Sequence, residues 1–183
     1  NHDELYAKSG HMVACEQFKL PIRTPEAPSL ELARLRALAV ADEGDSITVT
    51  GRRIKAVFSR SAGTLSSLAY DGVEVLANGG GPQLNLFRAM VDNDKWFLRD
   101  VERSGIASLS YTAKSVTVEQ PARGIVRVRC TVDCAGRSET GMVHTATFTI
   151  FGDGSIDVTN QVEPYGNLTV LPKLGVSLVL PKG

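Results

Sequence analysis

The chain contains 183 residues, of which 43% are hydrophobic, and its 20 basic and 20 acidic side chains give a formal net charge of zero. Binding to nucleic acid through its phosphates needs an excess of clustered Lys and Arg, so that class is excluded, and ordinary hydrophobicity excludes a disordered chain. No apolar run approaches the roughly 18 residues of a membrane span. The sequence therefore predicts a globular protein with neither a nucleic-acid partner nor a membrane segment.

The first part of the chain differs in character from the rest. Met12 to Leu20 has the pattern of a single strand, whereas three prolines within residues 21–28 predict a stiff extended connector, because proline fixes its own φ and disfavours helix in the residue before it. A lone strand cannot bury itself, so residues 1–20 are expected to end a domain whose remainder lies elsewhere. Ser29 to Ala41 has the composition of a helix capped by its serine, although an extended segment remains the alternative.

From Asp45 onward, apolar and polar residues alternate in short runs, interrupted roughly every 8 to 12 residues by turn residues. Asp71-Gly72 and Asp153-Gly154 stand between such runs and predict tight hairpins. The pattern favours an all-β sandwich of antiparallel sheets. The predicted strands contain Ile47 and Val49, Ile54 and Val57, Leu65 to Tyr70, Val73 to Leu76, Ser115 to Val118, Ile125 to Val132, Thr145 to Phe151, Ser155 to Val162, and Leu168 to Leu180.

The residues that commonly bind metals or form disulfides are scattered. Cys15, Cys130 and Cys134 are odd in number and lack zinc-ligand spacing, so they are interpreted as small buried hydrophobic residues. His144 is most simply a strand residue. Asn167-Leu168-Thr169 matches a glycosylation sequon, which has meaning only in a secreted eukaryotic protein. No metal site is predicted in this chain.

The densest group of reactive side chains lies between Phe87 and Trp96, where Arg88, Asp92, Asn93 and Asp94 occur together. Carboxylates, an amide and a guanidinium bind hydroxyl groups, and an indole packs against the apolar face of a sugar ring, so this composition is suited to a polyol ligand. The simpler alternative is a solvated loop in which the arginine forms a surface salt bridge with one aspartate.

A pair of catalytic carboxylates is not expected in this loop. The two carboxyls of a retaining glycosidase act from opposite sides of the sugar, whereas Asp92 and Asp94 are near neighbours on one short segment. A loop that binds a divalent ion is also disfavoured, because Trp96 and Leu98 stand where further oxygen ligands are needed.

Four segments together carry a resemblance to a known family. In chain order they are GHMVACEQFKLP at 10–21, FSRSAGTL at 58–65, FRAMVDND at 87–94, and LPKLG at 171–175 with LPKG at 180–183. They resemble patterns that recur in the same order in bacterial β-galactosidases of glycoside hydrolase family 2. One departure is Met90-Val91, which stands where that family usually has Pro-Thr, so the stiffening that proline would give the loop is absent.

The resemblance implies a fold and a division into domains. Residues 1–21 are expected to be the terminal strand or strands of an immunoglobulin-like domain, residues 22–36 a linker with prolines, and residues 37–183 the first part of an antiparallel β-supersandwich of the galactose mutarotase type. The chain would then be a C-terminal fragment of the enzyme, ending before the last domain is complete.

The resemblance also implies a function. Enzymes of this family hydrolyse terminal β-D-galactosides, and their nucleophile, general acid and metal ligands belong to a (β/α)-barrel that this chain does not contain. The fragment alone is therefore expected to be inactive and to hold no cofactor, whereas the parent enzymes commonly use Mg and Na. Arg88, Asp92, Asn93 and Asp94 match the family pattern and are expected to approach the active-site mouth, where they would contact the galactoside.

Two other functions remain open at this point. The chain is alternatively an independent carbohydrate-binding module that uses a sheet face or Trp96, or a structural domain for oligomerisation. Its expected partners are the parent's barrel and immunoglobulin-like domains, the galactoside substrate, and in the last case further copies of itself. The resemblance implies a bacterial protein, and the compartment, cytoplasm or periplasm, stays open.

Overall fold

The computed structural model describes residues 3–12, 15–22 and 34–182. The chain divides into two compact units, Asn1–Leu30 and Glu31–Gly183. The described residues of the first unit form no helix and no strand, and turns hold residues 3–11 together, with the main-chain N–H of Glu4 donating to Ala7 O at 2.8 Å. The strand predicted over Met12 to Leu20 is thus not formed by its described residues. A strand needs a neighbouring strand for its main-chain hydrogen bonds, and the described residues of this segment, 12 and 15–20, pair with no strand.

Of the two alternatives for Ser29 to Ala41, helix or extended chain, the structure shows the extended one over residues 35–41 and no α-helix there. Residues 29–33 lie outside the described residues, and the segment continues into strand β1 (Ala39–Glu43), which pairs antiparallel with β2 (Ser46–Thr50). Leu38, just before β1, is buried, and its N–H donates to Arg123 O at 3.0 Å. Pairing and burial within the second unit outweigh the weak helical propensity of this sequence.

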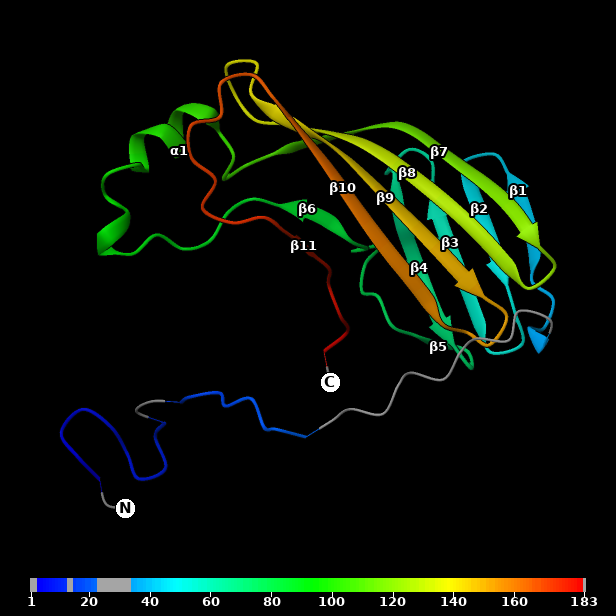
Figure 1. Ribbon diagram of the computed structural model, residues 1–183, viewed down its shortest axis with the longest axis horizontal. Coiled ribbons are helices and arrows are strands. Elements are labelled where there is room, and N and C mark those ends of the chain that lie inside the picture. Colours follow the sequence, from blue (N-terminus) through cyan, green and yellow to red (C-terminus); the bar gives the residue numbers. More distant parts are fainter. Residues whose placement is uncertain (1–2, 13–14, 23–33, 183) are drawn as a thin grey trace. The chain divides into compact units, whose positions relative to one another are not determined.

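A five-stranded antiparallel sheet forms the first layer of the second unit (Figure 1). Its order is β1-β2-β3-β4-β5, so each strand pairs with the next in the sequence. At the Asp71-Gly72 hairpin both residues have positive φ, 49° and 84°, as the tight turn that was predicted requires. The remaining strands are β3 (Ile54–Ser59), β4 (Thr64–Tyr70) and β5 (Val73–Glu74).

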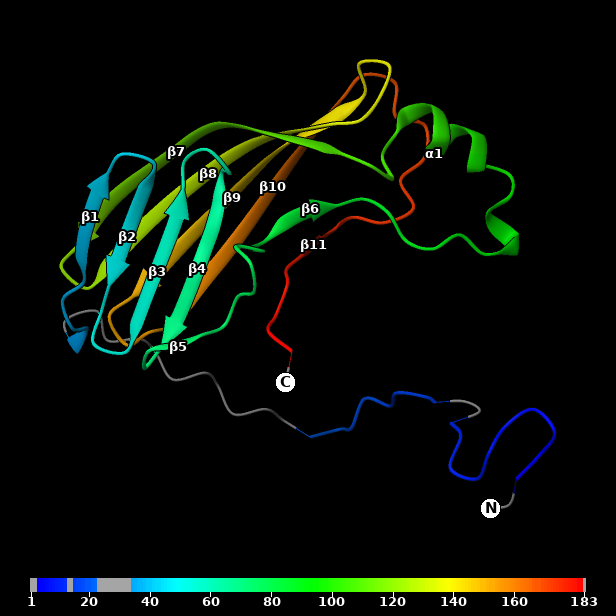
Figure 2. The ribbon, with the colours of Figure 1, turned by 180° about the vertical axis from the view of Figure 1, so that it is seen from behind.

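The second layer is a four-stranded antiparallel sheet of longer strands with the order β10-β9-β8-β7 (Figure 2). Its hairpin at Asp153-Gly154 joins β9 to β10, as the sequence predicted. Cross-strand pairs with β10 cover all of β9 except its last residue, from Gly141 opposite Tyr165 to Ile150 opposite Ile156. The strands are β7 (Ser110–Ala122), β8 (Ile125–Ala135), β9 (Gly141–Phe151) and β10 (Ile156–Tyr165).

The two sheets bury a shared core, so the predicted antiparallel β-sandwich is confirmed. The rings of Phe58 from β3 and Phe148 from β9 meet edge to face with centroids 5.1 Å apart. Alternating residues of both layers complete this first core, as strands with one buried face require. It includes Ile47, Val49, Ile54, Ala56, Leu65, Val116, Val126, Val128, Cys130 and Ile150.

A second core lies where the sandwich continues into a smaller substructure. There β6 (Gln83–Asn85) pairs with β11 (Gly175–Ser177), and helix α1 (Leu98–Ser104), which the alternating sequence did not predict, packs against the ends of β8 and β9. Within the described part of the chain, no helix has the length and apolarity to cross a membrane. The second core comprises Leu84, Leu86, Val101, Ile106, Val132, Cys134 and Met142.

The long strand predicted over Leu168 to Leu180 shrinks to the three residues of β11. Its partner β6 is equally short, so the ladder ends after three pairs. Beyond it, among the described residues up to 182, only Val179 exchanges main-chain hydrogen bonds with a neighbouring segment, donating to Gly80 O and accepting from Ala77, both at 2.8 Å. The apolar pattern of residues 168–180 predicted a long strand. The observed strand is short because β6 offers main-chain hydrogen-bond partners over three residues only.

The burial of the three cysteines differs between the two units of the chain. Cys130 and Cys134 are buried, one in each core, which confirms their interpretation as small hydrophobic residues. Cys15 is exposed, so the interpretation is wrong for this residue. It belongs to the first unit, whose described residues are nearly all exposed and form no core that could bury a thiol.

Candidate functional site

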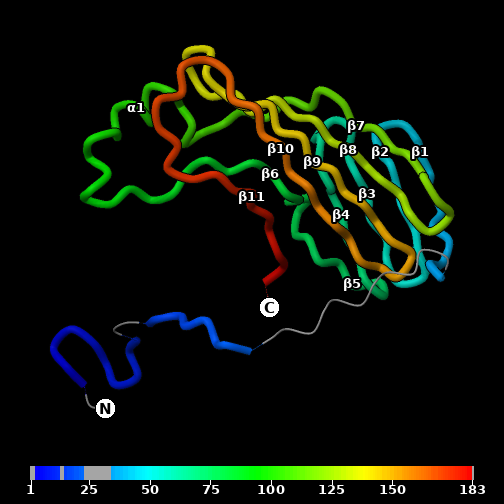
Figure 3. The backbone as a smooth tube through the Cα atoms, viewed as in Figure 1, coloured from blue at the N-terminus to red at the C-terminus, as the bar shows by residue number. Residues whose placement is uncertain are grey.

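The candidate site is the loop of residues 87–96, which leaves the second core between β6 and α1 and extends away from the two sheets (Figures 1 and 3). Leu84 and Leu86 are buried and anchor the chain before it emerges. Asn85 then accepts a hydrogen bond from the N–H of Phe87 at 3.0 Å, which starts the turn outward. The loop is therefore rooted in the core at its first residue.

Arg88 and Asp94 close this loop with a two-pronged ion pair. Arg88 Nη1 donates to Asp94 Oδ2 at 2.6 Å, and Nη2 donates to Oδ1 at 2.8 Å. The same guanidinium also donates to the carbonyl oxygens of Ala89, at 3.1 Å, and Pro172, at 3.3 Å. Paired bonds of this kind fix geometry as well as charge, so Arg88 ties the loop both to itself and to the segment before β11.

The surroundings of Asp94 keep its carboxylate ionised. Its hydrogen bonds with Arg88, and then the N–H of Val91 at 2.8 Å, hold the pKa of this aspartate below its ordinary value against the opposing effect of burial. The same pair raises the pKa of Arg88. A carboxylate with a lowered pKa and occupied oxygens does not serve as a general acid near neutral pH. Asp94 is therefore a positioning group.

Asp92 and Asn93 lie on the outer side of the loop. They begin a single 3₁₀ turn, η2 (Asp92–Asp94), whose third residue is buried while the first two are exposed. Asp92 forms an exposed ion pair with Lys95. The structure thus brings Arg88 and Asp94 together and leaves the other two predicted site residues facing outward.

Several large apolar side chains close to these two polar groups in the sequence are exposed as well. Trp96 is 91% exposed, and Val91, Phe87 and Leu98 are also exposed. An indole beside an amide and a carboxylate can stack on the apolar face of a ring while the polar groups bind its hydroxyls. The outer side of the loop therefore has the chemistry to contact a sugar or another protein surface.

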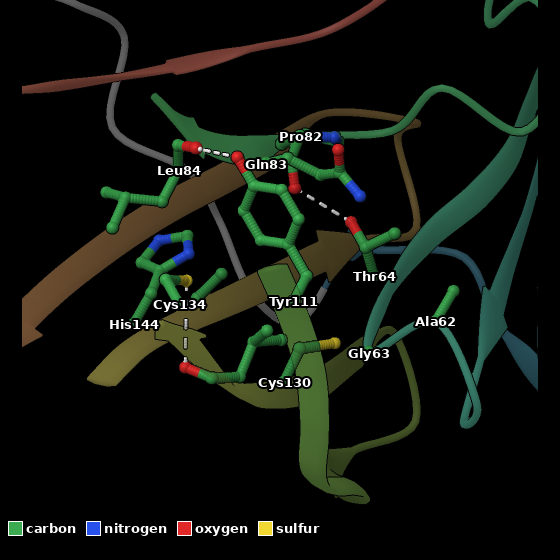
Figure 4. A pocket seen from close by; sticks show the side chains of 12 residues that line it. Ala62, Gly63, Thr64, Pro82, Gln83, Leu84, Tyr111, Cys130, Cys134 and His144 are labelled. Carbon is green, nitrogen blue, oxygen red and sulfur yellow. Dashed lines mark hydrogen bonds between the residues drawn. The ribbon is translucent and has the colours of Figure 1, made fainter. Parts of the chain in front are cut away.

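Two hydrogen bonds that sequence reasoning missed hold the root of the loop against the sandwich (Figure 4). Tyr111 of β7 donates from its hydroxyl to Leu84 O at 2.7 Å. Thr64 of β4 donates from Oγ1 to Pro82 O at 2.8 Å. Both layers of the sandwich thus contact the segment that contains β6, and no local pattern around these residues announces that role.

The space behind this contact is too small for a substrate. Cys130, Cys134 and His144 line a cavity of about 10 Å³, which is close to the volume that holds one water. Nε2 of the buried His144 lies 2.8 Å from Asn160 Oδ1, so this histidine is a strand residue, as predicted, and its side chain has a hydrogen-bond partner.

Burial raises the pKa of Cys130 to about 12 and that of Cys134 to about 11, which makes both thiols poor nucleophiles and metal ligands.

The described residues also offer no ready metal site. Among residues 3–12, 15–22 and 34–182, no group of three or more His, Cys, Asp or Glu side chains is placed to hold an ion.

The chain resembles known proteins over most of its length. Residues 50–183 match the family described as "Beta galactosidase small chain". The beta-galactosidase of Priestia megaterium is 31% identical over 176 residues, which are 95% of this chain and 16% of that protein. That of Halalkalibacterium halodurans is 33% identical over 186 residues, 98% of this chain and 17% of that protein. The chain thus spans about a sixth of the length of these relatives.

Proposed function

The chain belongs to the family of the beta-galactosidase small chain, and we propose that it is a non-catalytic segment of a larger beta-galactosidase. Retaining hydrolysis needs two carboxyls on opposite sides of the sugar. In the 87–96 loop, Asp94 is bound by Arg88 and Asp92 pairs with Lys95 at the surface. The nucleophile and general acid are assigned to another part of the parent protein, a (β/α)-barrel.

The role proposed for this segment is to hold the 87–96 loop at the mouth of that barrel. The observation that carries the proposal is the two-pronged Arg88–Asp94 pair, which sets the loop's shape from within and leaves Asn93 and Trp96 exposed. These outward groups would bind hydroxyls and pack on the ring of a terminal galactoside. Mg and Na are likewise assigned to the barrel.

A chimera tests this role. Residues 1–183 replace the matching segment of the Priestia megaterium beta-galactosidase, and turnover of a chromogenic galactoside is measured. The 183-residue chain alone should show no turnover, whereas the chimera should be active. Asn93→Ala in the chimera should raise KM by about fivefold, the effect of one lost hydrogen bond.

A matched control separates contact with substrate from a general effect on folding. Asn78→Ala changes the same type of side chain on a different loop and should leave KM unchanged. Turnover by the isolated chain that Asp92→Ala abolishes would overturn the proposal. So would an active chimera whose KM is insensitive to both Asn93→Ala and Trp96→Ala.

A further inference from the structure

A polar cavity of about 150 Å³ lies beside α1, and none of residues 87–96 lines it. Its lining residues come from three segments that are distant in the sequence: the end of α1, the hairpin between β8 and β9, and the chain just after β10. Figures 1 and 2 show that these three segments lie side by side. Its volume is roughly ten times that needed for one water and below the roughly 300 Å³ of pockets for drug-sized ligands. The space fits a small molecule.

The walls of this cavity are fixed by close contacts between main chains. The N–H of Arg137 donates to Ser104 O at 2.6 Å, which joins the hairpin to the end of α1. A Cβ at Gly136 would lie 2.2 Å from that same Ser104 oxygen, and one at Gly166 would lie 2.3 Å from Glu139 O. Since no other residue type permits these approaches without a shift of backbone, the three segments form a preorganised frame.

The hairpin that forms one wall is conformationally strained. Ser138 and Glu139 have φ of 52° and 57°, in the left-handed region that residues with a side chain rarely adopt, and the N–H of Thr140 closes the turn by donating to Arg137 O at 3.0 Å. Each such residue costs about 1 kcal/mol or more, and a two-residue hairpin turn requires positive φ at both of its central positions. A glycine at either position would relieve it.

The cavity also accounts for the Asn167-Leu168-Thr169 motif. Exposure alternates along these three residues, because Leu168 is half-buried against the second core whereas the residues on either side are exposed. Asn167 and Thr169 both line the cavity. The motif thus contributes an amide-bearing and a hydroxyl-bearing residue to the cavity wall, which is a reason for the motif that involves no glycosylation.

The chemistry of the lining selects a neutral ligand. Arg103 and Asp100 pair at 3.0 Å, so their charges cancel within the wall. The hydroxyls of the buried Ser104 and Thr140 donate to main-chain carbonyls, at 3.1 Å and 3.4 Å, and keep their oxygens available as acceptors. Asn167 adds both a donor and an acceptor.

We propose that this cavity binds a small, neutral polyhydroxylated molecule of about monosaccharide size. A ligand with several hydroxyls can donate to the serine and threonine oxygens and accept from Asn167 and Arg103. An anion would have to displace Asp100 from Arg103, and an apolar molecule would leave this lining without partners. The inference goes beyond the function proposed above and does not rest on it.

Binding to the 183-residue chain tests the inference directly. Galactose and myo-inositol are titrated by nuclear magnetic resonance, with sulfate as the charged comparison. Both polyols should saturate with a Kd in the millimolar range, and the shifted amide signals should be those of residues 138–140 and 167–169. Sulfate should cause no saturable change at these amides.

Substitutions in the cavity wall test whether the polyols bind in this cavity. Asn167→Ala combined with Thr169→Val should weaken polyol binding by about tenfold or more, because two wall contacts are lost. Thr112→Val, at an exposed residue of β7 that does not line this cavity, should leave this binding unchanged. Should the double variant not fold, Ser138→Ala takes its place. The proposal is overturned by the absence of saturation at about 100 mM, by binding that survives the double variant, or by competition from sulfate.

Discussion

Tyr111 and Leu84 are joined by a hydrogen bond of 2.7 Å from the phenol hydroxyl to the main-chain carbonyl oxygen. This bond connects β7 of the four-stranded sheet with β6, the short strand from which the 87–96 loop emerges. The side chain of Tyr111, which belongs to the sandwich, thus restrains the start of the 87–96 loop. None of residues 87–96 belongs to the core between the two sheets.

Removing this hydroxyl should loosen the root of the loop. Tyr111→Phe leaves the Leu84 carbonyl without its partner and should lower the free energy of unfolding by about 0.5 to 1.5 kcal/mol. Urea denaturation measures the loss, and hydrogen exchange should quicken in residues 84–94. Tyr6→Phe removes an exposed hydroxyl from the first unit and serves as the control. Unchanged exchange in the loop would contradict the role assigned to Tyr111.

The two aspartates of the loop should respond differently to the same substitution. Asp94→Asn breaks the partly buried ion pair with Arg88 and should lower Tm measurably, whereas Asp92→Asn breaks only an exposed pair and should leave Tm nearly unchanged. Thermal denaturation at neutral pH distinguishes them. Equal effects of both substitutions would show that the Arg88–Asp94 pair does not hold the loop.

The difference between wild type and Asp94→Asn should depend on pH. Because hydrogen bonds from Arg88 and Val91 lower the folded-state pKa of Asp94, its stabilising effect is complete above the ordinary value of 3.8. It disappears as the pH falls through the lowered folded-state pKa. The two Tm curves should converge on acidification, and curves that stay parallel would contradict this account.

The start of the η2 turn can be improved. Val91 occupies the position before the turn with extended backbone, φ −108° and ψ 174°, and forms no side-chain cap. Its N–H already donates to Asp94 Oδ2 at 2.8 Å. Val91→Thr adds an oxygen that can accept from the turn's own N–H groups and should stabilise the chain by about 0.5 kcal/mol. Val91→Ala provides the comparison without an acceptor, and equal stability of the two variants would refute the cap.

The three cysteines should react with a thiol reagent in two classes. Cys15 is exposed and should react rapidly, whereas burial protects Cys130 and Cys134 and raises their pKa values to about 12 and about 11. At about pH 8 one thiol should be modified quickly, and two more only after unfolding. Cys15→Ser should abolish the rapid phase. A second rapid thiol in the folded chain would show that one core is open.

The alternation of apolar and polar residues was enough to predict the sandwich, because a strand with one buried face must repeat every two residues whatever its partner. The hairpins at Asp71-Gly72 and Asp153-Gly154 were predictable for a similar reason, since the turn conformation depends on the residues in it. Composition left helix and extended chain open for Ser29 to Ala41, and pairing with β2 produced a strand at Ala39 to Ala41.

The sequence was enough to select the residues of the candidate site, because they lie in one run from Arg88 to Asp94. It did not predict which of these side chains contact one another. Which aspartate pairs with Arg88, and that the same guanidinium reaches the carbonyl of Pro172, 84 positions away, depends on how β6 and β11 pack together. The cavity beside α1 is likewise built from three distant segments. Local preferences act over a few neighbouring residues, whereas contacts between distant side chains exist only once the sheets have packed and fixed the distances between them.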